Sequence, residues 1–246
     1  AAMEMQMRQQ QKLESIGTLA SGVAHEINNP ITGIMNYAEL IEDLLPKDSP
    51  LVEHTSEIKR ETHRVATIVR NLLTFARNER QSHSPARVED IIEAVLSLVR
   101  AVIRRDQIHL TVTVSPDLPA LKCRSQQIQQ VIMNLVTNSR DALNERYPES
   151  HPDKVMNLEA RLVEKAGRRW IRISVEDHGT GIRPEVRERM FDPFFTTKGR
   201  DAGTGLGLSI SHGIVKEHHG EWTVETEPGR FTHMHVDLPV DNGWEI

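Results

Sequence analysis

The chain reads Asp177-His178-Gly179-Thr180-Gly181-Ile182 directly after a predicted strand, and Gly203-Thr204-Gly205-Leu206-Gly207-Leu208 directly before a predicted helix. Glycine lets the backbone come close to a phosphate group, and a helix N-terminus offers free N–H groups at the positive end of its dipole. Either stretch by itself is more often an ordinary turn. The chain has no Walker A loop, and no clear apolar strand precedes Gly203 as a Rossmann motif requires. Phosphate binding of another kind remains open.

A predicted helix over Ser125–Glu145 precedes both glycine-rich stretches and carries Asn134, Asn138 and Asp141 at steps of four and three. Residues at this spacing share one helix face. Such a polar stripe is usually only the solvated side of a helix. Here the apolar residues fall on another face, which leaves the asparagines available to a ligand. An amide oxygen suits Mg²⁺, which takes oxygen donors and keeps several water or phosphate ligands.

Strand and helix signals alternate from residue 85 to residue 246. Residues Ile108–Val114 alternate between apolar and polar, as in a half-buried strand. Strand pairs separated by helices predict an α+β domain, in which a helical layer covers a mixed, mostly antiparallel sheet. The other expected elements are the strands Asn157–Glu164 and Trp170–Glu176, the helix Leu208–His219, and a terminal hairpin of Glu221–Glu227 with Phe231–Leu238.

Residues 1–80 have a different character, because apolar residues recur there at steps of three and four on both sides of a turn signal at Pro46–Pro50. Two such helices form a hairpin that leaves apolar surface in water. Pairing two hairpins into a four-helix bundle covers it, so we expect a homodimer. From the periodicity alone, however, a coiled-coil spacer is the preferred interpretation. The first apolar seam comprises Leu13, Ile16, Ala20, Val23, Ile27, Ile31, Ile34, Ala38, Ile41 and Leu45, and the second helix carries Leu51, Ile58, Val65 and Leu72 beside Thr55, Thr62, Val69 and Ala76.

Length, charge and cysteine content limit the class of protein. A chain of 246 residues can hold one large domain or two modest ones, and we expect a hairpin domain over 1–80, a linker at Gln81–Pro85 and a second domain over 85–246. The net charge of −5 argues against general nucleic-acid binding. The single cysteine, Cys123, excludes an intramolecular disulfide framework and suits a reducing compartment such as the cytoplasm.

No apolar run approaches the roughly 18 residues that span a bilayer, so we expect no membrane contact from this segment. The chain begins abruptly in the helix-like stretch Met3–Lys12. We therefore expect it to be the C-terminal part of a longer protein, which leaves open whether that protein is a membrane-anchored sensor.

Five motifs in one order resemble the boxes of the two-component sensor histidine kinases. The segment His25-Glu26-Ile27-Asn28-Asn29-Pro30 resembles the H box, most closely that of the nitrogen-regulation type. The stretch from Asn134 to Asn138, the two glycine-rich stretches and Phe191-Asp-Pro-Phe-Phe195 resemble the N, G1, G2 and F boxes of the ATPase domain. That fold is shared with DNA gyrase, mismatch-repair ATPases and heat-shock chaperones. The resemblance extends from about residue 12 to the C-terminus and favours the kinase over the spacer.

The resemblance implies ATP and Mg²⁺ as cofactors. Asp177 matches the carboxylate that accepts a hydrogen bond from the adenine amino group, although an ordinary strand-end aspartate is the alternative. Asn138 matches the Mg²⁺ ligand, and Asn134 has a supporting role towards the phosphates. Gly179 and Gly181 match the backbone that passes under the nucleotide. The remaining expected nucleotide-binding residues, which include the two ends of a lid, are Asp141, Ile182, Thr197, Lys198, Gly203, Thr204, Gly205, Leu206, Gly207 and Leu208.

His25 lies two residues past the seam residue Val23, so it is expected to point out of the bundle core. A neutral imidazole can attack phosphorus, and a carboxylate on its other nitrogen, here that of Glu26, fixes the tautomer. The resemblance implies that His25 is phosphorylated from ATP and passes the phosphoryl group to an aspartate of a response-regulator receiver domain. Asn29 is expected to position the γ-phosphate or, in a phosphatase reaction, water.

Two other functions remain possible at this point: a nucleotide switch without kinase activity, like the chaperone and gyrase relatives, and a catalytically dead scaffold. The His25-Glu26 pair disfavours the first, and the complete set of boxes disfavours the second. The histidines at His218-His219 and His233-Met-His235 could suggest a metal, but no fourth ligand is convincingly spaced around them. Surface or strand histidines are the preferred interpretation.

Overall fold

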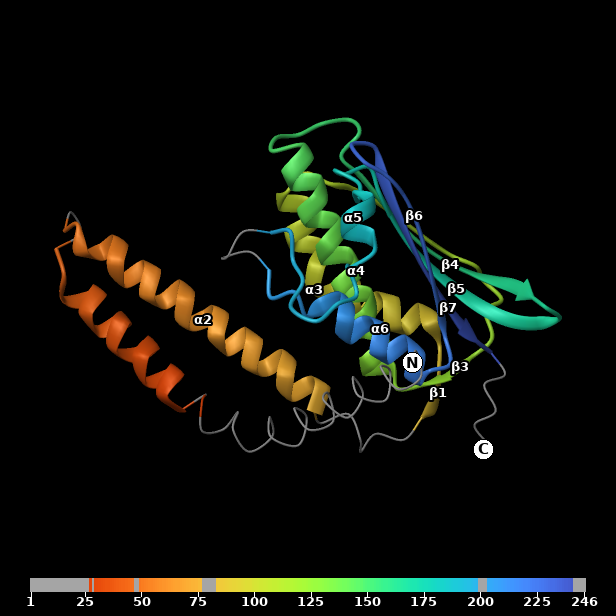
Figure 1. Cartoon of the computed structure of the whole chain (residues 1–246), viewed down its shortest axis with the longest axis horizontal. Helices are drawn as coiled ribbons and strands as arrows, with labels where there is room; N and C mark the ends of the chain where they lie inside the picture. The colour runs from red at the N-terminus through yellow and green to blue at the C-terminus, as the bar shows by residue number, and fades with distance from the viewer. Residues whose placement is uncertain (1–26, 28, 47–48, 77–82, 199–202, 241–246) are drawn as a thin grey trace. The chain divides into compact units, whose positions relative to one another are not determined.

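The computed structural model describes residues 27, 29–46, 49–76, 83–198 and 203–240 (Figure 1). The chain divides into two compact units, which we describe separately. The hairpin unit comprises residues 1–81 and 198–204, and the sheet unit comprises residues 82–197 and 205–246. In the described part of the chain, no helix combines the length and the apolarity that crossing a membrane needs.

The hairpin unit contains a helix over residues 29–44 and helix α2, Leu51–Ala76. The N–H of Ser49 donates to the carbonyl of Pro46 over 2.9 Å, which forms part of the expected turn. On the first helix the buried residues are Ile31 and Ala38, seven positions apart, and on α2 Thr55 and Thr62 repeat the same step. Both threonine hydroxyls donate to carbonyls of their own helix. The line of Thr55 and Thr62 on α2 therefore lies in the hairpin interior. The leucine–isoleucine line, formed by Leu51, Ile58 and Val65, does not.

The leucine–isoleucine line of α2 stays in contact with solvent within one chain. Leu51, Ile58 and Val65 are each at least 40% exposed, and so are Ile34 and Ile41 of the predicted seam on the first helix. One heptad line on each helix closes the hairpin, and a second line remains uncovered. The large apolar side chains exposed on the hairpin are Ile34, Tyr37, Leu40, Ile41, Leu44, Leu51, Ile58 and Val65.

The sheet unit is built on a five-stranded sheet of order β2-β4-β5-β7-β6. Strands β2 and β4 run parallel, and every other neighbouring pair is antiparallel. This confirms the mixed, mostly antiparallel sheet. The strands are β2, His109–Val114; β4, Val155–Lys165; β5, Arg168–Asp177; β6, Glu221–Glu227; and β7, Phe231–Pro239.

A layer of three helices covers one face of this sheet, as expected (Figure 1). Helix α4, Ser125–Arg146, contacts α3, Val88–Arg105, as well as α6, Gly207–Glu217, and strands β4 and β5. Helix α3 was not predicted, although its buried residues repeat at steps of three and four. A short helix, α5 at Pro184–Arg187, follows the first glycine-rich stretch. The buried residues of α3 are Val88, Ile91, Ile92, Val95, Leu96, Val99 and Ile103.

The expected linker at Gln81–Pro85 ends inside a strand. Strand β1, Ser84–Ala86, pairs antiparallel with β3, Leu121–Cys123, so that Ser84 faces Cys123 across the ladder. This pairing joins residues almost forty positions apart, and nothing in the local sequence indicated it. Burial raises the pKa of the Cys123 thiol to about 12, so the thiol stays protonated at neutral pH.

Candidate nucleotide-binding site

Asp177 is the last residue of β5, between Met156 of β4 and Thr232 of β7. Its side chain is buried, at 3% exposure, and its Oδ1 accepts a hydrogen bond from the N–H of Gly179 over 2.9 Å. Burial raises the pKa of the carboxyl to about 6, while hydrogen bonds from Ser139 and Gly179 act in the opposite direction. A buried acceptor beside a glycine-rich turn can recognise a hydrogen-bond donor such as an amino group.

Replacement of Asp177 by Asn is expected to change how stability depends on pH. The folded carboxyl holds its proton more tightly than the unfolded one, whose pKa is near 3.8, so its contribution to stability is fully present below that value and is lost as pH rises through about 6. The Asn variant does not undergo this loss. As the pH rises from 5 to 7.5, the unfolding free energy of Asp177→Asn minus that of the parent protein should therefore increase by about 1–2 kcal/mol.

Urea unfolding of the nucleotide-free protein at the two pH values measures this difference. Asp117→Asn removes an exposed carboxyl of the same unit and serves as the matched control. A difference between Asp177→Asn and the parent that stays constant over this range would show that Asp177 is ionised throughout.

The first glycine-rich stretch requires glycine because neighbouring atoms approach its backbone closely. A Cβ on Gly179 would lie 2.7 Å from Cβ of Ala142 on α4. Gly181 has a φ of +67°, and a Cβ there would lie 2.2 Å from the carbonyl oxygen of Glu227. The N–H of Gly229 also donates to the carbonyl of Thr180 over 2.6 Å. These two glycines hold the loop between α4 and the β6–β7 turn, a role that exists without any ligand.

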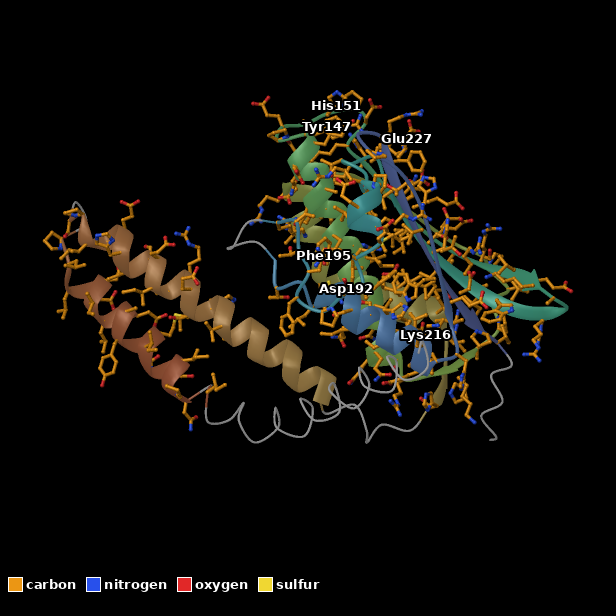
Figure 2. All side chains as sticks on the ribbon, viewed as in Figure 1. Tyr147, His151, Asp192, Phe195, Lys216 and Glu227 are labelled. Carbon is orange, nitrogen blue, oxygen red and sulfur yellow. The ribbon has the colours of Figure 1, made fainter. Side chains whose placement is uncertain are left out.

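Arg146, at the C-terminal end of α4, was not predicted as part of the site. One of its guanidinium nitrogens, Nη1, donates to the carbonyls of His178, Gly179 and Arg230 at 2.8–3.0 Å. The guanidinium also lies over the ring of Tyr147, which stacks on His151 near the end of this helix (Figure 2). Arg146 therefore holds the first glycine-rich stretch in place at the C-terminal end of α4. The only sequence signal for this role was an arginine in the last turn of a helix, and many helices carry one there.

The three predicted ligand residues of α4, Asn134, Asn138 and Asp141, are half-buried. The amide nitrogen of Asn134 donates to the carbonyl of Gly207 over 3.0 Å and to the hydroxyl of Ser211 over 2.9 Å. Asn134 thus links α4 to the beginning of α6, where the second glycine-rich stretch ends. The arrangement brings the N-box helix to the N-terminus of α6, as a phosphate site would require. The contacts of Asn138 and Asp141 with a ligand stay a prediction.

The second glycine-rich stretch contacts the phenylalanine-containing segment. Gly205 has a φ of +66°, and a Cβ there would lie 2.4 Å from the carbonyl carbon of Phe194. The N–H of Phe194 donates to the carbonyl of Gly205 over 2.9 Å. Phe195 lies under the guanidinium of Arg189 at 4.5 Å, near Asp192 (Figure 2). Phe191 packs against His212 and Trp222.

Two predicted site residues, His25 and Glu26, lie outside the described part of the chain, and so do residues 199–202 of the expected lid. Asn29 is described and lies exposed on the first helix. Thr197 and Lys198 directly precede residues 199–202 in the sequence, and Gly203 and Thr204 directly follow them.

His218 corrects the expectation of surface or strand histidines, because it is a buried residue at the end of α6. Its Nε2 accepts the N–H of Arg124 over 3.1 Å, which fixes Nδ1 as the nitrogen that donates to the carbonyl of Ile214 over 2.8 Å. Burial lowers the pKa of His218 to about 4, so the ring is neutral at pH 7. His218 thereby joins the beginning of α4 to the end of α6.

The chain matches two family models. Residues 15–81 match the His Kinase A phospho-acceptor domain. Residues 123–242 match the histidine kinase-, DNA gyrase B- and HSP90-like ATPase. The first match includes His25, Glu26 and Asn29, and the second includes the N-box helix and both glycine-rich stretches.

The proteins that resemble the chain along most of its length include the following two relatives and one solved structure. It is 34% identical to sensor kinase CckA of Brucella abortus, over 97% of the chain but 26% of that protein. It is 31% identical to the sensory histidine kinase/phosphatase NtrB of Vibrio alginolyticus, over 97% of the chain and 66% of that protein. The crystal structure of histidine kinase ThkA in complex with response regulator protein TrrA matches with a TM-score of 0.65 and 24% identity. The match covers 99% of the present chain and 67% of the ThkA chain, and it shows a shared fold.

Proposed function

Because the chain belongs to the two-component sensor histidine kinases, we propose that it is an ATP-dependent protein-histidine kinase that phosphorylates its own His25. The chain spans only part of the length of its relatives, 26% in CckA and 66% in NtrB. The observation that carries the proposal is that a phospho-acceptor match and an ATPase match occur in this order in one chain.

The geometry of the sheet unit supports ATP as the nucleotide. Asp177 offers a buried carboxyl oxygen at the end of β5, where the adenine amino group can donate to it. Gly179 and Gly181 keep the adjacent backbone free of side chains. Beside Asn134, near the middle of α4, the N-terminus of α6 can offer backbone N–H groups to the phosphates.

The residues of α4 fit a magnesium ion on the phosphate side. Asn138 is half-buried on the same helix face as Asn134, whose amide already reaches the beginning of α6. The amide oxygen of Asn138 would be the protein ligand. Mg²⁺, when bound, neutralises negative charge on the phosphates.

The phosphoryl transfer itself is assigned to His25. A lone pair on one ring nitrogen forms the N–P bond to the γ-phosphorus while the bond to the bridging oxygen of ADP breaks. Glu26 holds the N–H of the other ring nitrogen, which fixes the tautomer and stabilises the positive ring that results. The products are ADP and phosphohistidine.

A second copy of the chain and a response regulator are the proposed partners. The uncovered apolar line on the hairpin, which includes Ile34, Ile41 and Ile58, is the surface that pairing into a four-helix bundle would bury. The structure similar to this chain was solved with a response regulator protein. We propose that phosphohistidine passes its phosphoryl group to an aspartate of such a protein.

Phosphatase activity towards the phosphorylated regulator is the second candidate function. The exposed position of Asn29, one turn after His25, allows its amide to align a water molecule. The relative NtrB, at 31% identity, carries the name kinase/phosphatase.

Incubation of the purified chain with γ-labelled ATP and Mg²⁺ tests the proposed kinase. We expect incorporated phosphate that is labile in acid and stable in alkali, which is the signature of phosphohistidine. An added receiver domain should then remove the label from the kinase and acquire it in an acid-stable form. A correctly folded chain that fails to bind ATP would rule out the kinase.

A further inference from the structure

A group of potential metal ligands lies on the face of the sheet that the helices leave open. Glu225 of β6 pairs in register with His233 of β7, and His235 lies two residues further along β7 on the same face. One ligand atom from each of the three lies within 4.8 Å of the other two. Within the part of the chain that the structure describes, this is the one group of three or more His, Cys, Asp or Glu residues that meets this criterion.

The second ring nitrogen of each histidine already has a partner. Nδ1 of His235 lies 2.8 Å from the hydroxyl of Ser174, and its Nε2 faces a carboxylate oxygen of Glu225 at 3.9 Å. Nε2 of His233 lies 2.9 Å from a carboxylate oxygen of Glu176 on β5. Metal-binding histidines usually donate the N–H of their other nitrogen to a carboxylate or another oxygen, which orients the ring and fixes its tautomer. With these contacts kept, the ion would bind Nε2 of His235 and Nδ1 of His233.

We propose that Glu225, His233 and His235 bind a divalent transition-metal ion of the Zn²⁺ class, with Ser174 and Glu176 orienting the two rings. Two imidazoles and a carboxylate are a ligand set that zinc takes in proteins, with a fourth position open to water. Imidazole suits Zn²⁺, Cu²⁺ and Ni²⁺ better than it suits Mg²⁺ or Ca²⁺, which prefer oxygen ligands. The site is thus chemically distinct from the magnesium position proposed at Asn138.

The distances require only a small contraction. Ligand atoms about 2.1 Å from a tetrahedral zinc ion lie about 3.4 Å from one another. The side chain of Glu225 is 62% exposed and can rotate towards the rings, whereas those of His233 and His235 are 28% and 14% exposed and are held on the strand. Binding therefore needs movement mainly of the one flexible ligand.

Charges of both signs lie around the group. The charge of Arg172 opposes a cation at His235, but its guanidinium donates two hydrogen bonds, at 2.7 and 2.8 Å, to the buried carboxylate of Asp237. The carboxylates of Glu225 and Glu176 remain beside the two rings. An ion would join β6 and β7 on the outer face and should stabilise the sheet.

Zn²⁺ titration of the untagged 246-residue chain tests the proposal, in competition with a chromogenic chelator. We expect the parent chain to bind one more equivalent of Zn²⁺ at micromolar concentration than the double variant His233→Gln/His235→Gln. Zn²⁺ should raise the melting temperature of the parent reversibly with EDTA and leave that of the double variant unchanged. Co²⁺ in place of Zn²⁺ should give the visible absorption of a tetrahedral nitrogen–oxygen site.

Single variants separate the ligands from the residues that orient them. Glu225→Gln removes a ligand and should lower the Zn²⁺ affinity at least about tenfold. Ser174→Ala removes only the partner of Nδ1 and should lower it by about 10-fold or less, with the stoichiometry kept. His109→Gln, at an exposed histidine on β2, is the matched control and should bind Zn²⁺ like the parent.

Two results would overturn the metal site. One is a parent chain that binds no Zn²⁺ at micromolar concentration, in which case the His–Glu contacts are ion pairs only. The other is a double variant that binds Zn²⁺ with the stoichiometry and affinity of the parent, which would place the binding at other histidines. Nucleotide binding should be the same in all these variants, because Asp177 points from β5 to the helix-covered side of the sheet.

Discussion

Replacement of His25 by Gln is expected to abolish the incorporation of acid-labile phosphate from ATP, by at least about a thousandfold. Glutamine is similar in size and polarity, but its amide nitrogen has no available lone pair to attack phosphorus. The label retained after gel separation at alkaline pH measures the effect. ATP binding, measured by calorimetry, should not change, because Asp177 and Asn138, the residues proposed to hold the adenine and Mg²⁺, belong to the sheet unit.

His54→Gln is the matched control for this prediction, since His54 is an exposed histidine on α2 of the same hairpin. Its labelling should equal that of the parent chain. Undiminished labelling of His25→Gln would move the acceptor to another residue. Loss of labelling in both variants would point to damage of the hairpin rather than to chemistry.

Replacement of Asn138 by Ala is expected to lower labelling by at least about a hundredfold, the scale of losing one group that stabilises charge in the transition state. The alanine variant lacks the amide oxygen proposed to bind Mg²⁺, so the phosphates lose part of their charge neutralisation. The initial rate of labelling at saturating Mg²⁺ and ATP measures the loss. The dimer, measured by light scattering, should stay intact, because its proposed contacts are on the hairpin.

Asn144→Ala controls for the loss of an asparagine from α4. Its amide nitrogen donates to Asp106 over 2.8 Å, in a contact between α4 and the end of α3. This variant should be less stable to urea but should keep its Mg²⁺-dependent labelling. If Asn138→Ala instead dissociates the dimer, Asn138 is a structural residue and not a metal ligand.

The sequence predicted the elements whose signals are local. The terminal hairpin begins and ends within one residue of its expected limits, because alternating strands flank a Pro228-Gly229 turn. Helix α4 extends one residue beyond the prediction, since its apolar residues repeat at helical spacing. The order of the five boxes was sufficient to indicate the family.

The sequence missed features that depend on distant residues. Strand β1 was expected to be a linker, because its partner β3 lies almost forty positions away. Arg146 contacts carbonyls 32 to 84 positions along the chain, so its role at the glycine-rich stretch has no local signature. Helix α3 did have a helical repeat of apolar residues and could have been predicted.

The sequence by itself determined the two-part organisation, the family and the chemical groups available: an imidazole beside a carboxylate, asparagines on one helix face, and glycines where a nucleotide is expected. Only the tertiary structure decided which of these groups have altered properties. Asp177 has a pKa near 6 because strands and helices exclude water from it. Glu225 joins His233 and His235 because β6 and β7 pair in one register. Residue types and spacings are written in the chain, whereas burial and proximity arise only when distant segments pack together.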